Sequence, residues 1–231
     1  MKKNFHHYLG LVALVAGVLF VGGTMRSAEA AFKLRLIDSG TATTVTIADG
    51  GAGDASAVPG VIVFLGTVGN FDINVQVGQS KPTSGSAARP FMTILSSTAT
   101  SGGSGSTLVL ALTDTDFTPA ITLFKKAVNS ASPFTGPVTY AAFFDTGNAE
   151  FAITTAIGAG LSGSGIFNDL NSGAGPGSAP YSLTLLTTVT PVGTTPSQFD
   201  ASLSVPEPTS LLLLGFGFLA LGFFGRRKQL G

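Results

Sequence analysis

Residues 61–77 read VIVFLGTVGNFDINVQV, the clearest hairpin pattern in the chain. The first half, Val61–Thr67, is a mostly apolar run rich in β-branched residues, which is typical of a buried strand. Gly69-Asn70 then makes a tight connection. Phe71–Val77 alternates apolar with polar residues, the two-residue period of a half-buried strand. This stretch predicts two antiparallel strands joined by a short turn.

Similar patterns lie on both sides of the hairpin. Phe32–Ile37 alternates apolar and basic residues, and Thr43–Ile47 is β-branched. Further strand-like runs are Phe91–Leu95, Thr107–Thr113, Ala120–Val128, Val138–Phe144, Glu150–Ile157 and Tyr181–Val189. The stretch Gly158–Pro180 is dominated by Gly, Ser and Asn and is expected to be a connection. No segment has a helical stripe, and about nine or ten strands separated by turn signals predict an all-β domain, an antiparallel β-sandwich or jelly roll.

The first thirty residues have the pattern of a secretory signal peptide. Lys2 and Lys3 precede the apolar run Leu9–Val21, and Ala28-Glu29-Ala30 forms an A-x-A site for signal peptidase just before Ala31. An uncleaved membrane helix is the alternative. The small and more polar residues between the run and the A-x-A site favour cleavage. Either way, the central chain is expected to leave the cytoplasm.

The other end of the chain has three parts in a fixed order. Pro206-Glu207-Pro208 comes first, the apolar run Leu211–Phe224 follows, and Arg226-Arg227-Lys228 comes last. As a helix, residues 209–225 would rise about 26 Å, slightly less than a hydrocarbon core. The cations would stay on the cytoplasmic side. An ordinary permanent single-pass anchor in the inner membrane would also have an apolar run followed by cations.

This composite resembles a PEP-CTERM sorting signal. The resemblance covers only about the last tenth of the chain. It implies a Gram-negative host, transient retention in the inner membrane and cleavage near Pro206-Glu207-Pro208 by an exosortase. The product would then pass to the cell surface or into an exopolysaccharide matrix of the kind found in biofilms. The opening strand, the hairpin and the polar loop Gly78–Pro90 also resemble an exported domain of other PEP-CTERM proteins, which brings no known activity with it.

The sequence therefore predicts four parts. Residues 1–30 form a signal peptide helix and residues 31–189 an antiparallel β-sandwich or jelly-roll-like domain. Residues 190–204 form a Thr/Pro-rich linker, and residues 205–231 form the sorting signal with its hydrophobic transmembrane helix.

Composition limits the function of the central part. Six lysine and arginine residues stand against ten aspartate and glutamate residues between Phe32 and Ser204, a formal net charge of −4. This gives no basic footprint for nucleic acid. The chain has no cysteine, so the exported domain must be stable without disulfides.

Catalytic side chains are scarce as well. Both histidines, His6 and His7, lie in the signal peptide, which excludes histidine-dependent nucleophilic triads and soft zinc ligands from the exported part. Glu150 is the only glutamate between the two signals. A pair of carboxylates could still serve a hydrolase. We nevertheless expect no enzyme and no catalytic residues.

Two binding functions remain open. Loop carboxylates at Asp49 and Asp54, and at Asp114 and Asp116, could form weak calcium sites, although Asp is also a common turn residue. No other cofactor is expected. A carbohydrate module usually stacks sugars on Trp or Tyr, but the chain has no Trp, and only Tyr140 and Tyr181 lie in the exported part. The expectation is an exported, non-enzymatic surface or matrix protein with exosortase, signal peptidase and exopolysaccharide as partners.

Overall fold

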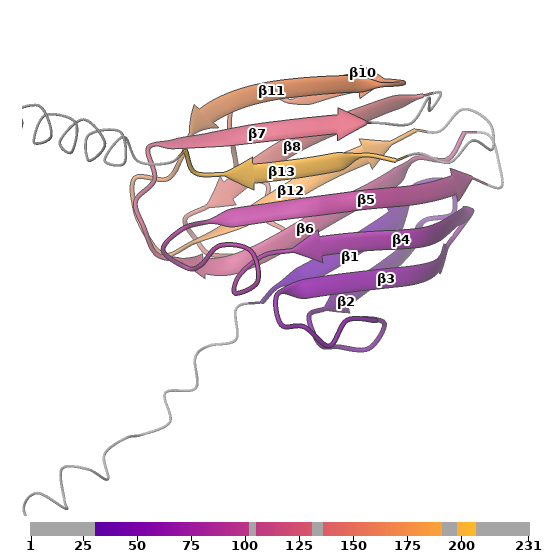
Figure 1. Cartoon of the computed structure of the whole chain (residues 1–231), viewed down its shortest axis with the longest axis horizontal. Coiled ribbons are helices and arrows are strands. Elements are labelled where there is room, and N and C mark those ends of the chain that lie inside the picture. Colours follow the sequence, from indigo (N-terminus) through magenta and orange to yellow (C-terminus); the bar gives the residue numbers. More distant parts are fainter. Residues whose placement is uncertain (1–30, 102–104, 131–135, 191–197, 207–231) are drawn as a thin grey trace, which may run out of the picture. The chain divides into compact units, whose positions relative to one another are not determined.

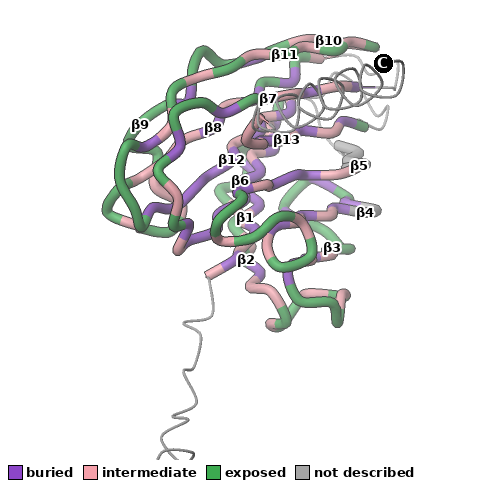
Figure 2. The backbone as a smooth tube through the Cα atoms, turned by 60° about the vertical axis from the view of Figure 1, so that its left-hand side comes forward, coloured by how far each residue is buried: buried purple, intermediate pink, exposed green. Residues whose placement is uncertain are grey.

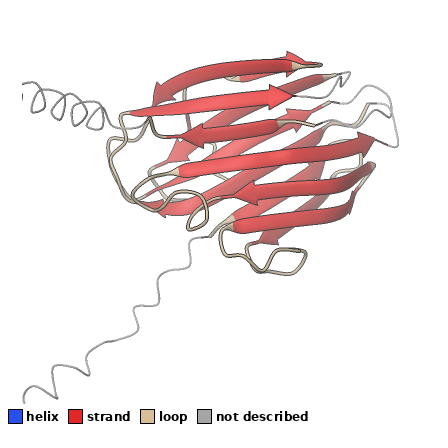
Figure 3. Cartoon of the chain, in the orientation of Figure 1, coloured by secondary structure: helices blue, strands red, loops and turns tan. Residues whose placement is uncertain are grey.

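The structure is a computed structural model that describes residues 31–101, 105–130, 136–190 and 198–206. The chain divides into two units, Met1–Ala30 and Ala31–Gly231, and the fold belongs to the second. Figure 3 shows that the described residues form strands and loops. None of them belongs to a helix long and apolar enough to cross a membrane. The predicted signal peptide helix and the predicted helix over Leu211–Phe224 lie outside the described residues.

The described residues form thirteen strands, which make up two antiparallel sheets (Figure 1). The seven-stranded sheet has the order β10-β8-β12-β6-β1-β2, with β9 paired to β8. Its strands are β1 Lys33–Asp38, β2 Thr43–Ala48, β6 Leu108–Phe117, β8 Pro137–Asp145, β9 Thr155–Ala156, β10 Leu161–Ser164 and β12 Tyr181–Val189. The six-stranded sheet has the order β11-β7-β13-β5-β4-β3. Its strands are β3 Val61–Val68, β4 Phe71–Gln79, β5 Phe91–Ser101, β7 Leu123–Ser130, β11 Phe167–Ala174 and β13 Asp200–Ser204.

The pairing of the later strands is nested. β5 pairs with β13, β6 with β12, β7 with β11, and β8 with β10. As the chain goes forward from β5 to β8, the partner strands go backward from β13 to β10. Even-numbered pairs lie in the seven-stranded sheet and odd-numbered pairs in the six-stranded sheet. Successive strand pairs thus alternate between the two sheets, which is the arrangement of a jelly roll. The prediction of an all-β antiparallel sandwich is confirmed.

The predicted hairpin is confirmed as β3 and β4. Val68 pairs with Phe71, so Gly69 and Asn70 form the two-residue turn. Gly69 has a φ of +58°, and a Cβ at this position would collide with the side chains of Asp38 and Thr41. Glycine is therefore needed here both for its backbone conformation and for the close approach of β1.

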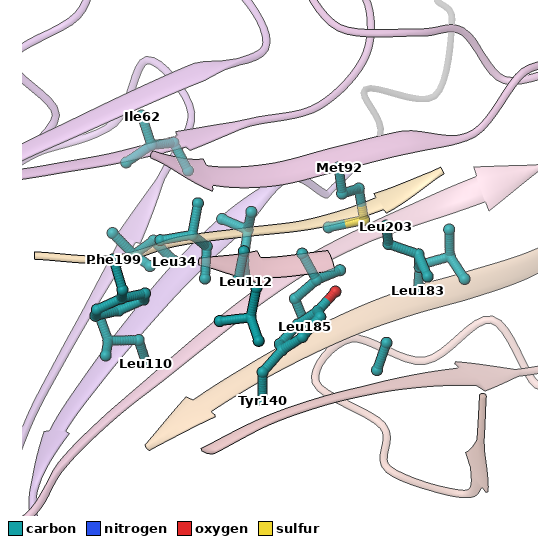
Figure 4. Close-up of a cluster of buried hydrophobic side chains, with 14 of the residues drawn as sticks. Leu34, Ile62, Met92, Leu110, Leu112, Tyr140, Leu183, Leu185, Phe199 and Leu203 are labelled. Atoms are coloured by element: carbon teal, nitrogen blue, oxygen red, sulfur yellow. The ribbon is translucent and has the colours of Figure 1, made fainter. Parts of the chain in front are cut away.

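The core fills the space between the two sheets. Figure 2 shows buried positions alternating with exposed or half-buried ones along the strands, as expected when one face of each strand packs inward. In Figure 4, Leu112 and Leu185 of the seven-stranded sheet share one cluster with Met92 and Leu203 of the six-stranded sheet. Each such side chain contributes roughly 1.5–3 kcal/mol when it is fully buried.

The prediction of a strand over Glu150–Ile157 is wrong for most of this segment. Only Thr155–Ala156 forms a strand, and the preceding segment lies against the outer face of the seven-stranded sheet. Arg35 lies over the Phe151 ring at 3.8 Å, and the Phe151 amide donates to Thr113 Oγ1 (3.0 Å). Phe151 and Ile157 of this segment pack against the sheet, while Ile153 is 61% exposed. The two-residue pattern alone does not distinguish such packing from strand pairing.

Two segments predicted as connections form strands. Gly158–Pro180 contains β10 and β11, and the predicted linker 190–204 contains β13. In β11 the polar and small residues alternate between half-buried and exposed positions. In β13, Ala201 and Leu203 are buried. Both strands are specified by pairing with distant strands, and their composition carries only a weak strand signal.

Candidate functional site

The last strand leads directly into the predicted sorting signal. β13 lies between β5 and β7 in the six-stranded sheet, with Ser204 opposite Phe91 on one side and Lys125 on the other. Its inward side chains, Ala201 and Leu203, are 1% and 0% exposed. β13 is thus an interior strand of the sandwich, although it is the last strand in sequence.

The sandwich ends within two residues of the motif. Val205 packs against the core, and both Val205 and Pro206 are half-buried. Pro206 has no amide hydrogen, so it cannot extend the strand pairing. The chain therefore leaves the sheet at the position where Pro206-Glu207-Pro208 begins.

A pocket of about 410 Å³ lies beside this junction. It is lined by Gly85, Ser86, Arg89, Pro90, Phe91, Ser204 and Val205. The loop that carries Arg89 is a tight turn, since the Ser86 amide donates to the Arg89 carbonyl (3.0 Å) and the Arg89 amide donates to the Ser86 carbonyl (3.1 Å). The lining of the pocket thus includes an arginine, a phenylalanine and two serines at the exit of β13.

Most residues of the predicted sorting machinery lie outside the described residues. These are Ala28, Ala30, Glu207, Pro208, Arg226, Arg227 and Lys228. Two predicted residues are described. Pro206 follows β13 directly, and Ala31, at the predicted signal cleavage site, donates from its amide to Thr115 Oγ1 (3.2 Å) close to the start of β1.

The first pair of predicted calcium ligands organises its own loop. The Gly60 amide donates to Asp49 Oδ2 (2.7 Å), and the amides of Ser56 and Val63 donate to Asp54 Oδ1 (2.9 Å each). These hydrogen bonds tie the glycine-rich loop to the start of β3. This is the turn chemistry that the sequence leaves open as the alternative to calcium.

The second pair belongs to a polar cluster at the end of β6. Asp114 is buried and accepts from Lys81 Nζ (2.8 Å) and Ser80 Oγ (2.5 Å). Burial raises the pKa of Asp114, and the ammonium of Lys81 opposes this effect. Asp116 accepts from Asn148 Nδ2 (2.7 Å). Within the described ranges the structure brings together no group of three or more acidic, histidine or cysteine side chains that could hold a metal ion.

The aromatic residues of the described chain are buried or half-buried. Tyr140 and Tyr181 are 1% and 0% exposed, and Tyr140 Oη donates across the core to the Ser202 carbonyl (2.9 Å). Burial raises the pKa of both phenols. Phe117 is buried as well, while Phe143 and Phe144 are half-buried. Sequence reasoning missed Phe91, the aromatic residue that lines the pocket, because nothing local marks its position beside β13.

Comparison with solved structures finds distant similarities, including the following three. The enzymatically active domain of tailspike protein 4 from bacteriophage CBA120 aligns with a TM-score of 0.33 and 10% identity, over 59% of this chain but only 19% of the tailspike chain. A carbohydrate-binding module of the β-sandwich superfamily aligns with a TM-score of 0.30 and 16% identity, over 75% of this chain and 70% of the module. A carbohydrate-binding module that recognises mannan aligns with a TM-score of 0.28 and 9% identity, over 59% and 89%. All three TM-scores lie below 0.5, so the fold assignment rests on the strands of this chain.

Sequence comparison is more specific at the end of the chain. No curated protein matches the sequence. The family model described as the PEP-CTERM protein-sorting motif matches residues 204–228. This match confirms the resemblance on which the predicted sorting signal rests. Such a motif implies exosortase processing and export to the cell surface or the extracellular space. The chain therefore carries a PEP-CTERM protein-sorting motif, which begins at the last residue of β13.

Proposed function

We propose that this chain is an exported, non-enzymatic surface or matrix protein that is held briefly in the inner membrane and released by exosortase cleavage near Pro206-Glu207-Pro208. One observation carries the proposal: the sorting motif begins where the interior strand β13 ends. In this function Leu211–Phe224 is the membrane stop, and Arg226, Arg227 and Lys228 hold the tail on the cytoplasmic side.

The position of β13 limits where the chain can be cut. A cut before Ser204 would remove part of a strand that pairs with both β5 and β7. A cut after Val205 would leave every strand of the sandwich in the released product. The proposal therefore places the scissile bond C-terminal to Val205.

The tether between the sandwich and the membrane is short. Six residues, 205–210, separate Ser204 from the apolar run, and fully extended they span at most about 20 Å. The uncleaved protein would thus hold its folded domain close to the membrane surface, where an exosortase in that membrane could reach the motif.

Sorting can be tested by two variants of the full chain in a Gram-negative host that carries an exosortase. Glu207→Ala removes the charged residue of the motif, and replacement of Arg226, Arg227 and Lys228 by Gln removes the cation cluster. Both variants are expected to stay in the membrane fraction or to be missorted. Asp169→Asn, which changes an acidic residue of β11 far from the motif in sequence, is the matched control. Normal surface delivery of both tail variants would contradict the proposal.

The junction pocket supports a second candidate function, the binding of an acidic exopolysaccharide. Arg89 offers a guanidinium for a sugar carboxylate, Phe91 offers an apolar surface, and Ser86 and Ser204 offer hydroxyls. The Arg89→Ala variant of the secreted protein is expected to bind isolated exopolysaccharide at least tenfold more weakly than the unaltered protein. Lys33→Ala, which removes a partly exposed cation from β1 in the other sheet, is the control. Calcium binding is tested in parallel by the melting temperature with and without millimolar calcium.

A further inference from the structure

One lysine of the six-stranded sheet points into the protein. Lys126 of β7 is 1% exposed, between the buried neighbours Phe124 and Val128 of the same face. Its Nζ donates to the Ala159 carbonyl at 2.5 Å. The ion pairs within the described residues are Lys33–Glu150 and Lys81–Asp114, and neither involves Lys126. A charged amine buried without a counter-ion is costly, and burial accordingly lowers the pKa of Lys126. The neutral, nucleophilic amine is therefore more populated at Lys126 than at an exposed lysine.

Asn171 of the edge strand β11 lies directly opposite this lysine. Lys126 and Asn171 are a register pair of the antiparallel ladder, so their side chains share one face of the sheet. The Cβ atoms of such a pair are about 4.5–5.5 Å apart. Asn171 Nδ2 donates to the same Ala159 carbonyl (3.2 Å) that accepts from Lys126 Nζ. The amine of Lys126 and the carboxamide of Asn171 are thus both bound to the Ala159 carbonyl oxygen.

The carboxamide of Asn171 is already polarised. The Ser172 amide donates to Asn171 Oδ1 at 2.7 Å. A backbone N–H in this position would stabilise the negative charge that develops on the oxygen when a nucleophile adds to the carbonyl carbon.

The segment that carries Ala159 packs tightly on β11. Ile157 is fully buried, and a Cβ added at Gly158 would lie 2.5 Å from the Ser172 carbonyl oxygen. A Cβ added at Gly173 would collide with the Gly158 backbone. The segment 157–159, β7 and β11 therefore keep the side chains of Lys126 and Asn171 close together.

We propose that Lys126 and Asn171 join in an intramolecular isopeptide bond between β7 and β11. Lys126 Nζ adds to Asn171 Cγ, and the oxygen of the tetrahedral intermediate is held by the Ser172 amide. The bond between Cγ and Nδ2 then breaks, and Nδ2 leaves as ammonia with the proton that Nζ gives up; the two nitrogens lie on the same Ala159 carbonyl, which brings them close enough for this transfer. No oxidant or cofactor is needed, because an amide is exchanged for an amide.

Such a bond suits this chain. The protein has no cysteine, so it cannot lock strands together with disulfides outside the cell. β11 is an edge strand of the six-stranded sheet and is made largely of Asn, Ser, Gly and Ala. A covalent link to β7 would hold the edge strand in place. This inference is independent of the sorting proposal.

The positions of the glutamates allow a direct test. Glu150 is the only glutamate between Glu29 and Glu207, and it separates Lys126 from Asn171 in sequence. The full chain is purified from its membrane or secreted fraction, denatured, digested with a glutamate-specific protease and analysed by denaturing gel and mass spectrometry. The expected product is one branched species whose mass is about 17 Da below the sum of its two fragments, which corresponds to the loss of one ammonia.

Three variants identify the bonded atoms. Lys126→Met and Asn171→Ala are each expected to give two separate fragments of unreduced mass. Lys125→Met, which changes the adjacent exposed lysine on the opposite face, is expected to keep the branched species. Two separate fragments from the unaltered chain would overturn the proposal, and so would a branched species that persists in Lys126→Met.

Discussion

At the scale of single residues, Asp38 joins three parts of the chain. Its buried carboxylate accepts from the Gly40 amide, the Thr41 hydroxyl and the Asn70 amide, each at 2.8 Å. Burial alone would raise the pKa of Asp38, but these hydrogen bonds outweigh it and hold the pKa below its ordinary value. The end of β1 is thereby tied to the turn of the β3–β4 hairpin.

Asp38→Asn is expected to lower the free energy of unfolding by about 1–3 kcal/mol, because an amide NH2 group would face donors that now meet an acceptor. A lowered folded-state pKa means that the charged group stabilises the fold above its unfolded-state pKa, near 3.8, and that this contribution is lost as the pH falls through the folded-state value. The difference between the two proteins should therefore shrink below about pH 4 in urea unfolding experiments. A constant difference from pH 7 to pH 3 would contradict this role.

The Lys33–Glu150 pair is a useful contrast. The two side chains meet at 2.7 Å but are 31% and 37% exposed. Exposed pairs contribute at most about 1 kcal/mol. Glu150→Gln is expected to change the melting temperature by no more than a few degrees. A loss as large as that of Asp38→Asn would mean that the segment over the seven-stranded sheet depends on this pair.

At the scale of elements, the sequence predicts best where the signal is local. The β3–β4 hairpin combines alternating side chains with a glycine at the positive-φ turn position, and both are visible in residues 61–77. β11 and β13 were missed because their polar and small residues are held in place by distant strands. Glu150–Ile157 was predicted as a strand because the sequence shows where its apolar residues lie, but not that Phe151 packs on the outer face of a sheet.

The same reasoning applies to the candidate site. Pro206-Glu207-Pro208 is recognisable in sequence, whereas the pocket beside it joins loop 85–90 to residues 204–205 across more than a hundred positions. The sequence alone shows Lys126 only as one residue of the strand-like run Ala120–Val128. Its burial and its partner Asn171 became visible only through the register of β7 and β11.

β13 should contribute to stability as an interior strand. Leu203→Ala removes a fully buried side chain and is expected to cost about 2–5 kcal/mol, measured by chemical denaturation. Ser202→Ala, on the opposite face of the same strand, is the matched control and should cost under about 1 kcal/mol. Equal, small effects would show that β13 is dispensable and that residues 200–204 behave as the linker predicted from sequence.

At the scale of the whole molecule, the order of strands along the chain links folding to export. β13 is last in sequence but lies in the interior of its sheet. If the chain is exported as proposed, the sandwich is complete only when the chain has crossed the membrane as far as Ser204. Under the proposed function, folding is finished at the point where the sorting motif reaches the enzyme, and cleavage after Val205 releases a domain that has all its strands.

Intact mass, measured on the protein from each cell fraction of its host, tests release at the motif. The predicted result is a species that begins at Ala31 and ends within a few residues of Pro206, recovered from the cell surface or the medium. A species that retains Arg226, Arg227 and Lys228 and remains in the inner membrane would contradict it. The tail would then be a permanent anchor.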